Sequence, residues 1–563
     1  MLVLTAVFCA LAAAQSRFLI GNIDGISYMS IGRQYAEGDI GDALNAYWSP
    51  AVSWLLAPLV AVGIDPVRAF LLINVAASTG TVALAALALR TATTRLLPLI
   101  TVSGMLIPLL VATVDELTPD PLVITWVMGF VLTVVWAMRR FEQPSRRDAL
   151  VVGCTLGVLA AAGYFVKLYL LPVAGVTLLA LLVFGFLRRD ARRRLLAAGG
   201  IAVAAWCIVV APWVVAISAK YDTPTLGTSL AVNLANKFEA STTIRDMSLV
   251  LESPPNPAAV SFGEDRSPQS ALAAADASTS TPLTTKLRYY LGERLRALPY
   301  YLDRLSSMSP LIVPTLVISV TLLAFGVARA RRTPLVAAAS ITGLVYALGY
   351  AAITSANTSG GNVRYYWPIF ACTVLVLGWA VHPVAGYLSH GRPTRHRVVA
   401  VILCVLAVGQ SVLANGIGYG APFSITSSPG PRPVALWGSP EPPHYVQLAA
   451  ELDVVLQGED VKIASNNYRT ALRVAFLDDA AIYGRAGRGY DISRTVFQAA
   501  LDAADIDYFL DFRPEAAPTA ELPAESVYTS VAALHTLSAC QDLAGAPEEA
   551  CTITVYARAT AAR

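Results

Sequence analysis

Long apolar runs alternate with short polar segments through most of the chain. A helix that crosses a hydrocarbon core of about 30 Å needs roughly 17 to 25 predominantly apolar residues. About eleven runs meet this length, at 2–20, 67–89, 96–114, 121–138, 149–165, 168–187, 195–218, 311–328, 334–354, 367–388 and 398–417. We therefore expect a polytopic α-helical membrane protein with about 11 transmembrane helices.

Composition agrees with this pattern, since 55% of the 563 residues are hydrophobic and only 14% are charged. Such values exclude an ordinary soluble enzyme. The net charge is only +3, and the basic residues form short clusters between apolar runs. We therefore expect membrane lipids as partners, and no nucleic acid. The abundance of arginine and alanine is typical of GC-rich bacterial genomes, which makes a bacterial plasma membrane the expected location.

The arginine clusters fall in every second loop, at 90–95, 139–147, 188–194, 329–332 and 392–397. Cytoplasmic loops carry the excess of arginine and lysine, so these five loops are expected to be cytoplasmic. The loops at 21–66 and 219–310 then face outward, together with the tail that follows residue 417.

The first apolar run has a second interpretation. Residues 2–14, followed by Gln15, also resemble the core of a signal peptide, although no basic segment precedes them. We favour a retained helix. Both interpretations leave the loop after Gly21 outside.

The first outer loop, 21–66, carries two amphipathic segments. Asp24 can cap the first segment, and its apolar stripe suits a helix lying on the membrane surface. The stripe consists of Tyr28, Ile31 and Tyr35. The second segment begins near Ser49 and Pro50, a favourable helix start.

Three carboxylates lie in the link VDELTPDPLV, where the third span ends and the fourth begins: Asp115, Glu116 and Asp120. Carboxylates at a membrane boundary can bind sugar hydroxyls or a divalent cation. Asp120 precedes Pro121, so it is expected to cap the fourth helix. Asp115 and Glu116 remain as substrate-binding candidates.

Two cations occupy matching outer positions. Lys167 lies in the apolar hairpin GYFVKLYLLP, and Arg364 precedes Tyr365 at the start of the tenth span. An uncompensated cation is costly there, and a lipid phosphate is a natural partner. The alternatives remain open: Lys167 can snorkel toward headgroups, and Arg364 can anchor the span beside aromatic residues.

Four segments together resemble the GT-C superfamily of polyprenyl-phosphate-dependent glycosyltransferases, which includes protein mannosyltransferases and lipid A aminoarabinose transferases. They are NIDGISYMSIGRQYAEGD with AYWSPAVSWLLAPL, VDELTPDPLV, GYFVKLYLLP and NVRYYWPIF, and the resemblance covers roughly the first 370 residues. It implies that Asp24 is the catalytic base. The family's usual acidic pair is interrupted here by Gly25, so a second carboxylate must come from elsewhere, with Asp39 and Asp42 as weak candidates.

The resemblance implies an inverting glycosyltransferase that moves a sugar from a polyprenyl-phosphate donor to a glycan, lipid or protein acceptor of the cell envelope. Glycosyl transfer needs the acceptor hydroxyl deprotonated, which an aspartate can do, although Asp24 could also be only a helix cap. Lys167 and Arg364, with Tyr365, would contact the donor. Asp115 and Glu116 would bind sugar or cation. No cofactor is required, and a divalent cation is optional.

Two other functions fit the same composition. A lipid-linked sugar flippase is one, but transporters commonly show internal repeats, and no convincing repeat is present. An inactive GT-C-like accessory subunit is the other, and the glycine at position 25 is its main support.

The end of the chain differs in character. After the transmembrane region (1–417), a Pro- and Gly-rich linker (418–443) leads to about 120 residues (444–563) that we expect to form an extracytoplasmic α/β domain. Its expected strands lie at 461–465, 480–484, 507–512 and 552–557, and its first helix at 444–456. This domain would recognise an acceptor glycan or cap the membrane core.

Two further features lie in outer segments. Residues 253–282, rich in Ser, Pro and Ala, have the composition of a mobile segment that gates access. Cys540 and Cys551 could pair as a disulfide in an exported domain. The histidines and cysteines show no metal-ligand spacing, so neither zinc nor haem is expected.

The orientation can be tested with single cysteines and a membrane-impermeant thiol reagent applied to intact cells. Because arginine-rich loops stay in the cytoplasm, a cysteine at an accessible position of the tail near residue 465 should react, and one in the 188–194 loop should not. The opposite labelling pattern would show that the predicted orientation is inverted.

Overall fold

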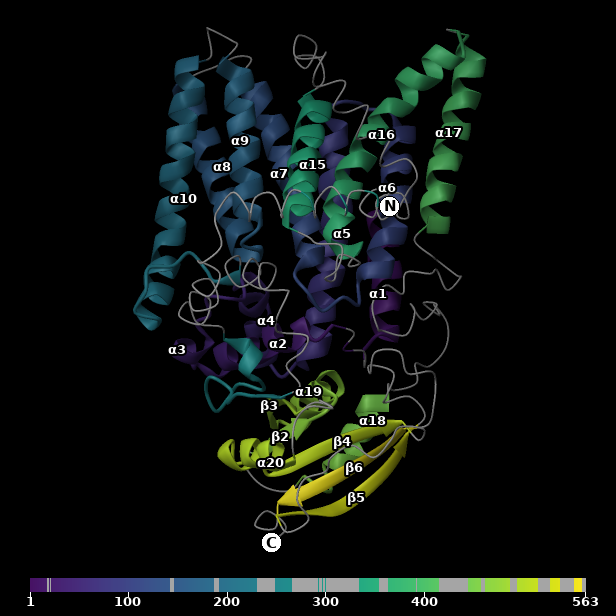
Figure 1. The fold of residues 1–563 in the computed structure, drawn as a ribbon. Coiled ribbons are helices and arrows are strands. Elements are labelled where there is room, and N and C mark those ends of the chain that lie inside the picture. The colour runs from purple at the N-terminus through teal and green to yellow at the C-terminus, as the bar shows by residue number, and fades with distance from the viewer. Residues whose placement is uncertain are drawn as a thin grey trace.

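The computed structural model describes most of the chain (Figure 1). The described residues are 1–17, 20, 22–141, 146–186, 192–229, 249–265, 292, 296, 299, 334–353, 363–390, 392–414, 444–456, 461–486, 494–514, 527–536 and 551–558. The predicted span at 311–328 lies outside them, as do Cys540 and the linker 418–443.

The chain is mostly helical, as expected for a membrane protein. Within the described residues, seven helices are long and apolar enough to cross a membrane. They are α5 (Pro66–Arg90), α6 (Leu96–Thr113), α7 (Asp120–Arg140), α8 (Arg146–Val166), α10 (Arg192–Lys220), α16 (Trp367–Leu388) and α17 (Pro393–Ala414). Three other helices coincide with predicted spans: α1 (Leu2–Gln15), α9 (Leu170–Phe186) and α15 (Pro334–Ile353). The number of crossings, about eleven, stays a prediction.

Small residues let two of these helices approach closely. A Cβ atom added to Gly153 of α8 would lie 2.7 Å from the carbonyl oxygen of Ala198 on α10. Gly157, one turn further, faces Ala202 in the same way. Close backbone contact at small residues is how helices associate in lipid, where the hydrophobic effect gives little drive.

Three short helices lie across one end of the bundle, between the long helices and a sheet (Figure 1): α2 (Asp24–Glu37), α3 (Ile40–Ala43) and α4 (Ala51–Ala61). The predicted start of α4 at Pro50 is confirmed. That α2 lies along the membrane surface stays a prediction, but its apolar stripe packs inside the protein. Its polar residues Ser27, Ser30 and Gln34 are buried along with its apolar ones, so both faces are covered.

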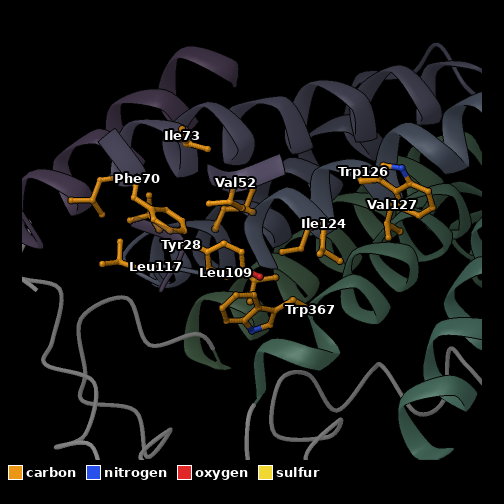
Figure 2. Packing of buried hydrophobic residues seen from close by; sticks show 14 of the residues in the cluster. Tyr28, Val52, Phe70, Ile73, Leu109, Leu117, Ile124, Trp126, Val127 and Trp367 are labelled. Atoms are coloured by element: carbon orange, nitrogen blue, oxygen red, sulfur yellow. The ribbon is translucent and has the colours of Figure 1, made fainter. Parts of the chain in front are cut away.

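Large apolar side chains fix this end of the bundle to the long helices. Figure 2 shows Tyr28 of α2 and Val52 of α4 among residues of α5, α6, α7 and α16. The Ser53 hydroxyl also donates to the carbonyl of Tyr28 at 2.9 Å. The position of α2, which begins at Asp24, is therefore determined by the core.

The sheet has six strands in the order β1-β3-β2-β4-β6-β5. The four predicted strands are present as β2 (Lys462–Ser465), β3 (Ala481–Ala486), β4 (Tyr508–Pro514) and β6 (Cys551–Arg558). β5 (Tyr528–Thr536), η1 (Phe262–Glu264) and the helices α18 (His444–Leu452), α19 (Tyr468–Leu477) and α20 (Arg494–Ala503) complete the described elements around it. β2 pairs in parallel with β3 and β4, and the other pairs are antiparallel.

The edge strand β1 (Leu249–Leu251) comes from the long loop between α10 and α15. We call residues 249–265 the connector. Besides β1, the connector forms a bridge from Ser261 to Ile482, and the Ile482 amide donates to the carbonyl of Val260 at 2.7 Å. Within the segment expected to be mobile, residues 259–261 and 264 are buried and contact α2 and β3.

Glu264 anchors the connector. Its carboxylate accepts hydrogen bonds from the backbone amides of Val260 (2.7 Å) and Ser261 (3.2 Å), and the Gln34 amide of α2 reaches it at 3.5 Å. The Asn45 side chain donates to the backbone carbonyl of Glu264. Burial raises the pKa of Glu264 to about 8, although these hydrogen bonds and nearby Arg33 favour the charged form.

The C-terminal elements also contact α2 and the segment that precedes it. The Arg473 side chain of α19 donates to the carbonyl of Ile20 at 2.8 Å, and the amide of Ile20 donates to the Tyr445 hydroxyl. Arg33 of α2 pairs with Asp479 at 2.6 Å and lies 4.3 Å above the centre of the Phe476 ring.

The buried Glu264 predicts a pH-dependent stability. Because its pKa in the folded protein lies above the usual value, its contribution is fully present below the ordinary glutamate pKa and is lost as pH rises toward 8. Between about pH 5 and 8, one such group changes stability by at most about 1.4 kcal/mol per pH unit. Glu264→Gln should flatten this part of the pH profile of the melting temperature in detergent. Identical profiles for both proteins would contradict the assignment.

Candidate active site

Four segments that are distant in sequence meet at the end of the bundle that faces the sheet. Asp24 is the first residue of α2, and residues 114–119 link α6 to α7. Lys167 lies between α8 and α9, and Arg364 lies in the short helix η3 (Val363–Tyr366) before α16. Ion pairs connect them.

Arg364 is the centre of this cluster. Its side chain is only 7% exposed, and carboxylates of three segments surround it. Its Nη2 donates to the Asp24 carboxylate at 2.9 Å, its Nε lies 3.5 Å from Asp120, and its Nη1 lies 3.9 Å from Glu116. The proposed base Asp24, the substrate-binding candidate Glu116 and a further carboxylate, Asp120, therefore converge on one guanidinium.

Asp120 joins the two predicted cations. One carboxylate oxygen accepts from the Lys167 ammonium at 2.7 Å, and the other accepts from the Thr118 hydroxyl at 2.9 Å and faces Arg364. The prediction that Asp120 caps a helix is wrong, because α7 begins at Asp120 and its side chain makes no cap hydrogen bond. Asp120 is the site residue that sequence reasoning missed. The signal was the pair of outer cations, which require an anionic neighbour.

Asp24 is not a helix cap either. The N-cap residue of α2 is Ile23, which makes no side-chain cap hydrogen bond. The Asn22 side chain accepts a hydrogen bond from the Asp24 amide at 2.9 Å, while the Asp24 carboxylate turns to Arg364. This placement leaves the carboxylate available for a charged partner.

Hydrogen bonds from α5 fix the link 114–119, which we call the acidic link. The buried side chain of Asn74 donates to the carbonyls of Val114 (3.0 Å) and Glu116 (2.7 Å). Burial, strengthened by the neighbouring Glu116 charge, raises the pKa of Asp115 to about 7. Burial also raises the pKa of Glu116, and this effect outweighs the opposing charge of Arg364.

Tyr365 lies beside both cations. The Lys167 nitrogen is 5.1 Å and the Arg364 guanidinium carbon 5.3 Å from the centre of its ring. Both separations fall within the range of cation–π attraction. Tyr365 thus supports the two cations that were predicted to contact the donor.

The weak candidates Asp39 and Asp42 do not join the cluster. Both are exposed near α3, and neither pairs with Arg364. Position 25 has no room for the side chain of a second acidic residue. A Cβ atom there would lie 2.5 Å from the carbonyl oxygen and 2.6 Å from the Cβ of Leu117 in the acidic link. The additional carboxylates around Arg364 come from Glu116 and Asp120.

The described carboxylates do not form a metal site in this arrangement. Among the described residues, no group of three His, Cys, Asp or Glu side chains has the geometry to hold a metal ion. Arg364 and Lys167 fill the space between the carboxylates instead. Elsewhere, His382 Nδ1 and His396 Nε2 lie 3.0 Å apart without a third ligand among the described side chains.

Solved structures of other proteins share this architecture, although their sequences differ strongly from this one. No protein-family model matches the sequence, and no curated protein matches it. A crystal structure of the oligosaccharyltransferase of Archaeoglobus fulgidus, in the apo form, matches 91% of this chain and 69% of its own, with TM-score 0.54 and 10% identity. ArnT from Cupriavidus metallidurans, bound to undecaprenyl phosphate, matches 98% of this chain and 97% of its own, with TM-score 0.52 and 14% identity.

The chain shares the fold of these two proteins. At the level of the fold, this confirms the resemblance to the GT-C superfamily that the four sequence segments indicated. At such low identity the likeness establishes the fold alone, and the roles of individual residues remain proposals. A further structure of the archaeal enzyme, in complex with Zn and sulfate, matches 91% of this chain and 67% of its own, with TM-score 0.51 and 11% identity.

The close packing of Gly25 is testable. Gly25→Ala should destabilise the protein by about 1 to 3 kcal/mol, because the new methyl group overlaps Leu117. Gly41→Ala is the matched control, since a Cβ atom there meets nothing within 4 Å. Melting temperatures in detergent should separate the two variants, and equal values would show that the 25–117 contact can relax.

Proposed function

We propose that the protein is an inverting membrane glycosyltransferase that transfers a sugar from a polyprenyl-phosphate donor to an acceptor in the cell envelope. The observation that carries this proposal is the cluster of Asp24, Asp120, Lys167 and Arg364 at one end of a GT-C fold. The cluster combines a half-exposed carboxylate with two cations, which are the groups that this reaction requires.

Asp24 acts as the general base. It takes the proton of the acceptor hydroxyl while the acceptor oxygen forms a bond to the anomeric carbon of the sugar. The bond from that carbon to the donor phosphate breaks, and its electron pair goes to the phosphate oxygen. Attack from the opposite face inverts the anomeric configuration. A lipid phosphate is a good leaving group, so no protein general acid is needed.

Lys167 and Arg364 stabilise the departing phosphate. Their separation from each other is set by Asp120, which contacts both. Tyr365 lies against both cations and helps to bind the donor. A fixed pair of cations stabilises developing negative charge without reorganising during the reaction.

Asp115 and Glu116 serve as auxiliary ligands for sugar hydroxyls. Both lie in the link that Asn74 holds in place, which gives them a defined position beside the base. A divalent cation is optional. No step of the proposed mechanism is routed through a metal.

The proposed location is a bacterial plasma membrane. The transmembrane catalytic domain comprises residues 1–417, and the outer domain 444–563 faces the same compartment as the active site. The mixed sheet and α2 lie at one end of the bundle, which is compatible with this arrangement (Figure 1). The acceptor is a glycan, lipid or protein of the envelope.

The central test is the activity of Asp24→Asn. This substitution keeps size but removes the base, so turnover should fall by about two to four orders of magnitude with the fold retained. Purified protein would be assayed for transfer from a panel of polyprenyl-phosphate sugars. Asp222→Asn, at an exposed carboxylate, is the matched control and should keep full activity.

Lys167→Ala and Arg364→Ala should weaken both donor binding and turnover, by roughly 1 to 3 kcal/mol each, if they contact the phosphate. Full transfer by Asp24→Asn would remove this residue from the mechanism. Movement of donor across reconstituted bilayers without transfer would support a flippase, and the absence of both activities would support an accessory subunit.

A further inference from the structure

The three guanidinium nitrogens of Arg364 differ in their hydrogen bonds. Its Nη2 donates to Asp24. Its Nε and Nη1 are buried and make no hydrogen bond to any part of the chain that the structure describes, although Asp120 and Glu116 lie 3.5 and 3.9 Å away. A buried guanidinium with unused N–H groups is poised to bind a further anion.

The shape of a guanidinium limits how that anion can bind. Two parallel N–H groups point outward along the Nε–Nη2 edge and along the Nη1–Nη2 edge, and phosphate binds such an edge with two oxygens. Nη2 contributes one N–H to each edge, and it now donates to the Asp24 carboxylate at 2.9 Å and to the Tyr365 hydroxyl at 3.5 Å. A phosphate that binds along the edge used by Asp24 must therefore displace this carboxylate.

The three carboxylates around Arg364 differ in how easily they can leave. Asp120 is 3% exposed and is held by Thr118 and Lys167. Glu116 is 33% exposed, and its oxygen lies 3.9 Å from Arg364, beyond hydrogen-bond distance. Asp24 is 38% exposed, and among the described residues Arg364 is the one partner of its carboxylate. Asp24 is therefore the carboxylate that both occupies an N–H group of Arg364 and can turn to solvent.

We propose that the Asp24 carboxylate and the donor phosphate compete for Arg364, so that Arg364 holds the base in the empty site and releases it when the phosphate binds. This inference rests on the proposed function and adds a control of that same site. The carboxylate becomes free to accept a proton only when a donor is in place. Donor binding thus precedes activation of the acceptor hydroxyl.

Competition has a measurable consequence, because removing the competitor should strengthen phosphate binding. The probe is undecaprenyl phosphate, titrated into the full-length protein in lipid nanodiscs. Asp24→Asn and Asp24→Ala should each bind it about 5- to 20-fold more tightly than the wild type, the gain expected when a charge-assisted hydrogen bond no longer opposes binding. The alanine variant should show the larger gain, since asparagine can still accept from Arg364.

Two controls separate competition from a general electrostatic effect. Glu116→Gln removes the same charge beside the same guanidinium, but from an oxygen at 3.9 Å, and should tighten binding by less than Asp24→Asn. The double variant Asp24→Asn with Arg364→Gln should bind like Arg364→Gln alone, because no contested group remains. Melting temperatures would establish that each variant is folded.

The outcomes distinguish the two proposals. Binding that depends on Arg364 but is unchanged or weakened in both Asp24 variants would overturn the competition and leave the proposed function standing. An equal gain in Glu116→Gln, or a gain that persists without Arg364, would also overturn it. Failure of the wild type to bind undecaprenyl phosphate would contradict both the competition and the proposed function.

Discussion

The buried guanidinium of Arg364 is the constraint on which the candidate site depends. Taking a charge out of water costs several kcal/mol, and this cost is offset only when close partners surround the charge. Arg364 meets the requirement with carboxylates from α2, from the acidic link and from α7. Each of these segments also packs in the apolar core. The charge cluster and the end of the membrane bundle therefore stabilise one another.

The sequence predicted the members of this cluster better than their partners. Asp24, Glu116, Lys167 and Arg364 could be selected individually, because each is charged beside an apolar run. Their pairing could not be predicted, since Asp24 and Arg364 are 340 residues apart. Asp120 was missed because a local rule competed with a distant one. Its position before Pro121 is typical of a cap, whereas its partner Lys167 lies 47 residues away.

The fold shows the same division between local and distant information. Apolar runs predicted the helices, because lipid requires a backbone that satisfies its own hydrogen bonds. Alternation predicted four strands of the sheet. The edge strand β1 was not predicted, since its three residues become a strand only by pairing with β3. The burial of the polar face of α2 was not predicted, for a related reason. Its polar face is covered by the connector and α19, which lie hundreds of residues away along the chain.

The covering of α2 has a mechanical consequence for the site. This helix has 14 residues, a length of about 21 Å, and it carries Asp24 at its first position. At its other end, Arg33 and Gln34 contact Asp479 and Glu264, so the connector and the C-terminal elements fix the helix axis. At Gly25, contact with Leu117 fixes the beginning of the helix. With both ends held, α2 cannot shift readily, and an exchange of partners at Arg364 is most easily accommodated by rotation of the Asp24 side chain. Such a rotation needs little rearrangement of the backbone, which suits a base that must be released in every catalytic cycle.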